Sequence, residues 1–200
     1  MNNYYLYDYV NSLERVLSAG YLSTYSTSAL ERNISYSSCF QKIEDDKHSS
    51  PVINDSQLVK SIMPEINVDL FKIPVLKQCL WASESYIRIQ EKTGLTFECI
   101  FLYIPIRKMY DYFALYHEMD FSQIVDEFQR LYLSHSPLEI LIKKSNYSLE
   151  DVSRLLAIPY ETLVSFKKRK RDIKKASVGI VQKLSKLFNV RIETIAEIKL

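Results

Sequence analysis

The chain has 200 residues, 47% of them hydrophobic and 25% charged, with only 3 Gly and 6 Pro. This composition can form a buried core, and it excludes disordered and collagen-like polymers. The sequence contains no G-x-G-x-x-G or G-x-x-x-x-G-K-[ST] phosphate loop and no G-x-S-x-G nucleophile turn, which argues against nucleotide-dependent and α/β-hydrolase chemistry. A chain of this length is expected to form one large or two small domains.

The first domain is predicted to consist of helices separated by polar breaks. A capping box at Ser28 predicts a helix over residues 29–44. Apolar residues three and four apart predict a second helix over residues 75–94, and another capping box predicts a helix that begins at Asp120. Residues 97–119 suit a buried strand as well as a helix, and we favour the helix. The fold class is therefore predicted to be all-α.

The three cysteines, Cys39, Cys79 and Cys99, fit neither a disulfide framework nor a C-x-x-C zinc site. We predict reduced thiols in the core, no metal and no cofactor. The chain starts without a basic, apolar secretion signal, and its most apolar segment, residues 95–106, is too short to span a bilayer. These features predict a cytoplasmic protein without a membrane partner.

Charge and aromatic residues divide the chain near residue 133. Residues 134–200 carry 14 Lys and Arg against 7 Asp and Glu, a net charge of +7, whereas residues 1–133 carry 12 against 17, a net charge of −5. The first part also holds 21 of the 25 aromatic side chains. We predict an acidic, Tyr-rich domain over residues 1–133, which forms a dimer or binds a partner or signal, and a basic domain over residues 137–200. Ordinary packing of the tyrosines is the alternative.

Five short helices are predicted in the basic domain. Ser136, Pro137 and Glu139 form a capping box with proline at the first helical position, and Ser148 caps the next helix. Pro159 turns the chain into a third helix. The predicted helices cover residues 137–144, 149–156, 159–170, 178–188 and 192–198.

Residues 137–198 resemble the Cro and lambda-repressor type (Xre family) helix-turn-helix domains. The resemblance is carried by the stretch from Tyr147 to Phe166, YSLEDVSRLLAIPYETLVSF, and by VxxLxxLFNVxIETI from Val181 to Ile195. The sequence departs from the family at Leu149, where Gln is common, and at a helix-one Arg and a later Glu, which are here Ile142 and Lys167.

The resemblance implies a sequence-specific regulator that binds double-stranded DNA, with its third helix in the major groove. We expect Tyr160, Glu161, Thr162 and Ser165 to face base edges. The predicted phosphate contacts are Ser148, Lys167, Lys168, Arg169, Lys170, Arg171, Lys174 and Lys175. A homodimer on a two-fold operator is expected, and we expect no catalytic residues and no enzymatic activity.

Two alternatives remain open at this stage. An antitoxin or inhibitor would bind a protein through residues 1–133 and repress its own operon through the basic domain. The spacing of Arg130 and His135 resembles the R-x(4–6)-H signature of the HEPN ribonucleases, which implies action of this pair on an RNA phosphate. Leu131 stands where that family usually has a small polar residue.

Overall fold

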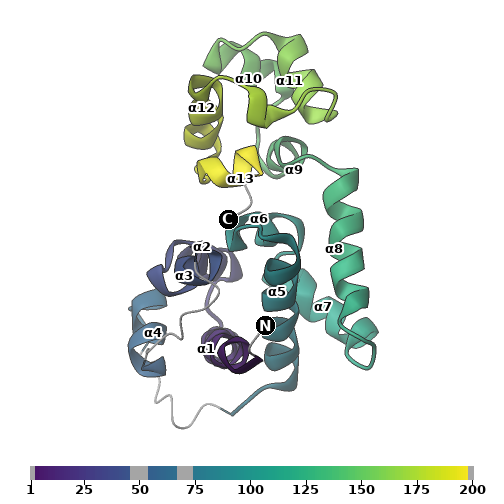
Figure 1. Ribbon diagram of the computed structural model, residues 1–200. Coiled ribbons are helices and arrows are strands. Elements are labelled where there is room, and N and C mark those ends of the chain that lie inside the picture. The colour runs from purple at the N-terminus through teal and green to yellow at the C-terminus, as the bar shows by residue number, and fades with distance from the viewer. Residues whose placement is uncertain (1–2, 46–53, 67–73, 198–200) are drawn as a thin grey trace.

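The computed structural model describes residues 3–45, 54–66 and 74–197, and throughout these ranges the regular structure is helical, without strands. The prediction of an all-α chain is thereby confirmed. Figure 1 shows an N-terminal body, a long helix along one side of it, and a group of short helices at one end. The first eight helices are α1 (Asn3–Leu22), α2 (Thr27–Tyr36), α3 (Ser38–Asp45), α4 (Asp55–Ile62), α5 (Lys77–Thr93), α6 (Phe97–Tyr103), α7 (Ile106–Tyr116) and α8 (Ser122–Ser134).

Helix α5 is the centre of the N-terminal body. It packs against α1, α6, α7 and α8, and side chains on several of its faces are buried, among them Ala82, Tyr86 and Ile89. The helix ends where Gly94 adopts a left-handed conformation (φ 68°), which glycine reaches without the steric cost of a Cβ atom. The helix predicted over residues 75–94 is confirmed, with its start at Lys77.

The predicted single helix over residues 29–44 is wrong, because the chain breaks at Ser37, whose backbone is extended. The residue that caps α2 is Ser26, two positions before the predicted Ser28. Glu31 stands three residues after Ser28, where it would complete that capping box, but it instead accepts the backbone N–H of Ile106 at the start of α7, over 2.7 Å. A tertiary contact has therefore replaced the local one, and burial raises the pKa of the Glu31 carboxyl although this hydrogen bond opposes the rise.

Residues 97–116 form two helices and no strand, which confirms the helical prediction for this part of the segment. Pro105 separates α6 from α7, since proline disfavours the helical conformation at the residue before it. Most of α6 is buried, from Phe97 to Tyr103, which explains why its sequence shows no helical period. Helix α8 begins at Ser122, and the carboxylate of Asp120 accepts the Ser122 backbone N–H.

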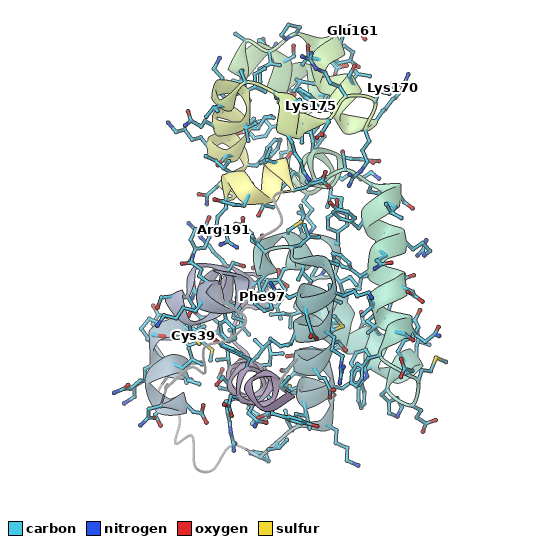
Figure 2. The ribbon with its side chains drawn as sticks, viewed as in Figure 1. Cys39, Phe97, Glu161, Lys170, Lys175 and Arg191 are labelled. Carbon is cyan, nitrogen blue, oxygen red and sulfur yellow. The ribbon has the colours of Figure 1, made fainter. Side chains whose placement is uncertain are left out.

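The three cysteines are buried and free, as predicted. Burial raises the pKa of all three thiols, that of Cys39 to about 11, so each is held in the unreactive protonated form at neutral pH. Figure 2 labels Cys39 inside the N-terminal body. In the described ranges, no helix is both long enough and apolar enough to cross a bilayer.

The five helices expected after residue 136 are all present. Helix α11 ends at Lys167, three residues before the predicted end, and α13 ends at Ala196. A short 3-10 turn, η2, precedes α12. The bounds are α9 (Pro137–Lys144), α10 (Leu149–Leu156), α11 (Tyr160–Lys167), η2 (Ile173–Lys175), α12 (Val178–Phe188) and α13 (Ile192–Ala196).

Helices α9 and α13 join this group to the N-terminal body, and α10, α11 and α12 lie at its far end (Figure 1). The Glu98 carboxylate of α6 accepts the Arg191 backbone N–H over 2.7 Å and the Thr194 hydroxyl over 2.6 Å. The Lys144 ammonium donates to the Leu102 carbonyl over 2.9 Å. The junction therefore uses the N- and C-terminal helices of the group and leaves the middle ones facing away from the body.

Candidate nucleic-acid interface

Helix α10 begins with a reciprocal cap. The Ser148 hydroxyl accepts the Asp151 backbone N–H, and the Asp151 carboxylate accepts the Ser148 backbone N–H, each over 3.1 Å. The hydrogen bonds that the Ser148 hydroxyl and the Ser148 backbone N–H donate to the Asp151 carboxylate lower the pKa of Asp151. Ser148 is exposed, and its hydroxyl also donates to Asp151, so its role in the structure is that of the helix cap.

The connection between α10 and α11 is three residues long. Ala157 adopts a left-handed conformation (φ 50°), and the backbone N–H of Ile158 donates to the Ser153 carbonyl. The Ser153 hydroxyl donates back to the Ile158 carbonyl over 2.7 Å. Because Ile158 is also buried, this turn fixes the angle between the two helices, and Pro159 then precedes α11.

Helix α11 has one buried and one exposed side. Leu163 and Phe166 are buried in the core of the C-terminal helices. The four residues predicted to face base edges lie outside this core: Tyr160 and Glu161 are exposed, and Thr162 and Ser165 are partly exposed. Figure 2 shows Glu161 at the outer end of the molecule, away from the N-terminal body.

Two of these side chains already have local partners. The Ser165 hydroxyl donates to the Glu161 carbonyl over 2.8 Å, which leaves its oxygen able to accept. The Tyr160 hydroxyl faces Glu150 of α10, whose negative charge raises the pKa of the phenol. The four residues thus offer both donors and acceptors on one exposed face.

Basic residues follow this face directly, in a stretch that we call the cationic segment, residues 167–175. The backbone N–H groups of Lys170 and Arg171 donate to the Ser165 carbonyl, and the Asp172 carboxylate caps η2. The Arg171 guanidinium lies 5.8 Å from the centre of the Phe166 ring. Besides Arg169, which is described below, the exposed cations are Lys168, Lys170, Arg171, Lys174 and Lys175, and Lys167 is partly buried.

Within the described ranges, none of these six cations forms an ion pair. Like charges this close repel one another, and a polyanion beside them would relieve that repulsion. Figure 2 shows Lys170 projecting from the same end of the molecule as Glu161. The structure therefore brings the predicted base-reading face and most of the predicted phosphate contacts together.

Arg169 is the exception to the predicted phosphate contacts. Its guanidinium pairs with the Glu197 carboxylate at 2.6 and 3.0 Å and also donates to the carbonyls of Tyr132 and His135. The guanidinium is directed at Glu197 and at the end of α8, so Arg169 differs from the other cations among the predicted phosphate contacts in having charged and polar partners within the chain. No local pattern indicates Glu197 as its partner, because 28 residues separate them.

Arg130 and His135 do not share a partner. Arg130 forms an ion pair with Glu127, and the His135 Nδ1 atom lies 3.1 Å from the Glu139 carboxylate. Arg130 lowers the pKa of Glu127 through this hydrogen bond. The two side chains thus contact carboxylates of different helices, and no contact among the described residues joins Arg130 to His135, so this arrangement gives the ribonuclease alternative no support.

The chain matches no protein-family model, no curated protein and no solved structure. Any functional assignment for the chain therefore comes from its own residues and their arrangement.

Proposed function

We propose that the chain is a sequence-specific DNA-binding transcriptional regulator of the Xre helix-turn-helix type. In this proposal α10 and α11 are the helix-turn-helix, and α11 lies in the major groove, which is wide enough to admit an α-helix. One observation carries the proposal. The exposed face of α11, at the end of the molecule away from the N-terminal body, stands beside six cations of the cationic segment that form no ion pair in the described ranges.

The two parts of this surface have different roles in the proposal. Lys168, Lys170 and their neighbours neutralise phosphates and release counterions, which gives affinity for any duplex. The hydroxyls of Thr162 and Ser165 and the carboxylate of Glu161 reach base edges, where the pattern of donors and acceptors depends on sequence. Glu161 would accept from the amino group of a cytosine.

The N-terminal body is proposed to form a homodimer or to bind a partner or signal. Tyr7, Leu115 and Leu133 expose more than 60% of their surface, whereas Tyr9 is buried. Large exposed apolar side chains are typical of protein interfaces. A symmetric dimer would present two copies of α11 to half-sites about one helical turn apart. A different protein that copurifies with the chain would instead favour the antitoxin alternative.

We expect the double variant Thr162→Ala/Ser165→Ala to lose sequence preference while it keeps most of its general affinity for DNA. Each lost base contact is expected to cost about 1–3 kcal/mol of discrimination between the right and the wrong base. The measurement is selection of bound duplexes from a random pool with the full chain. The wild-type chain should enrich one motif, and the variant should enrich it weakly or not at all.

Ser177→Ala is the matched control, because this exposed serine lies outside α11 and makes no side-chain cap. This substitution removes one hydroxyl group of the same kind at a position outside α11, and it should leave the selected motif unchanged. Selection of the wild-type motif, with equal enrichment, by the Thr162→Ala/Ser165→Ala variant would refute base reading by α11.

A further inference from the structure

Arg169 joins segments that are far apart in the sequence. Besides Glu197, which follows α13, its guanidinium reaches the Tyr103 hydroxyl at the end of α6 over 3.3 Å. It also donates to the carbonyls of Tyr132 and His135, over 2.8 and 2.9 Å, at the end of α8. The same guanidinium lies 4.9 Å from the centre of the Tyr132 ring. One side chain of the cationic segment is therefore held by both the N-terminal body and the last helix.

The backbone conformation at Arg169 allows its side chain to reach these partners. Its φ of 52° lies in the left-handed region, which is sterically unfavourable for a residue with a Cβ atom and persists where surrounding contacts enforce it. The turn directs the Arg169 guanidinium toward the body and Glu197, whereas its exposed neighbours Lys168 and Lys170 form no ion pair in the described ranges. The Ser136 hydroxyl donates to the Lys167 carbonyl over 2.9 Å and holds the start of the same segment.

The pair with Glu197 is partly buried. The Glu197 side chain is 9% exposed and that of Arg169 is 32% exposed. A bidentate contact of this kind has a defined geometry, and removal of either partner leaves the other charge without compensation. Loss of Arg169 or of Glu197 should therefore release the same segment.

We propose that Arg169 is a positioning residue for the DNA interface, which fixes the cationic segment and the angle of α11 relative to the N-terminal body. This inference rests on the proposed function. Arg169 does not touch DNA in this account; it makes the N-terminal body part of the binding apparatus. In a dimer held by that body, the angle of α11 decides whether both copies reach their half-sites together.

The test compares Arg169→Gln and Glu197→Gln with Lys168→Gln in the full chain. Binding is measured at several salt concentrations on duplexes that carry one or two copies of the motif selected by the wild-type chain. Lys168→Gln, a phosphate contact, should lower the slope of log affinity against log salt by about 1. Arg169→Gln and Glu197→Gln should leave that slope unchanged and weaken binding to two half-sites by about tenfold, a typical size for coupling between sites. The double variant should bind no worse than the weaker single variant.

Glu197→Gln is the most informative variant. The positioning role predicts weaker binding to DNA, whereas the change in charge alone predicts stronger binding. This substitution removes a negative charge, which would strengthen attraction to DNA if Glu197 had no positioning role. Tighter or unchanged binding by Glu197→Gln overturns the proposal. A fall in slope of about 1 for Arg169→Gln also overturns it, since Arg169 would then be a phosphate contact.

A second measurement does not depend on DNA. The amide hydrogens of Lys170 and Arg171, which bond to the Ser165 carbonyl, should exchange about tenfold faster in Arg169→Gln and in Glu197→Gln. Tyr103→Phe removes one hydroxyl only and should show a smaller increase in the exchange rate of these amides. This variant keeps the test valid if the other variants fail to fold. Unchanged exchange overturns the positioning role, whereas a wild-type chain that binds no duplex refutes the proposed function itself.

Discussion

Replacement of Lys168, Lys170, Arg171, Lys174 and Lys175 together by Gln is expected to lower the affinity for every duplex, cognate or random, by about 10³-fold near 0.1 M salt. These five side chains are exposed, and none has an ion-pair partner among the described residues. Each phosphate that a cation neutralises adds about 0.9 to the salt slope, so the magnitude of the slope should fall by about 4.5. Mobility shifts on two duplexes at several salt concentrations measure both quantities.

The matched control neutralises five exposed cations of the N-terminal body. Their removal changes the net charge equally, but they lie outside the C-terminal helices, and the affinity for DNA should fall by less than about tenfold. Equal losses in both five-residue variants would mean that net charge, and not the cationic segment, attracts DNA. The control residues are Arg32, Lys60, Lys77, Lys92 and Arg107.

The second large effect concerns stability. Leu163→Ala is expected to lower the free energy of unfolding by about 2–5 kcal/mol, because this side chain is fully buried and its removal leaves a cavity. A loss of that size is comparable with the whole stability of many domains, so DNA binding should be lost as well. Urea unfolding followed by circular dichroism gives the value.

Thr162→Ala is the neighbouring control, since Thr162 lies on the partly exposed face of α11. Its effect on the free energy of unfolding should stay within about 0.5 kcal/mol. The two adjacent substitutions should therefore separate stability from sequence preference. A Leu163→Ala variant as stable as Thr162→Ala would contradict the packing of α11 described above.

The C-terminal helices could be predicted because their boundaries are encoded locally. Ser136 accepts the backbone N–H of Glu139, and Ser148 forms its cap within four residues. Pro159 stops one helix and precedes the next within a few positions. The exposed face of α11 followed from the spacing of its buried residues alone, so the candidate base-reading residues needed no knowledge of tertiary structure.

The sequence analysis missed contacts in which a side chain binds a distant partner. Glu31 has the spacing of a capping box, yet it accepts from Ile106, 75 residues later. Arg169 stands in a run of five cations that look alike in the sequence, and only the fold brings it to Glu197 and the end of α8. Local patterns predicted neither contact, because each depends on how helices from different parts of the chain pack together.

Titration of the full wild-type chain against a DNA duplex, between about 50 and 200 mM salt, tests the central claim most directly. Five or six available cations predict that log affinity falls linearly with log salt, with a slope of about −4 to −5. An affinity that does not change over this range, or no binding at the lowest salt concentration, would contradict a DNA-binding role for the surface formed by α11 and the cationic segment.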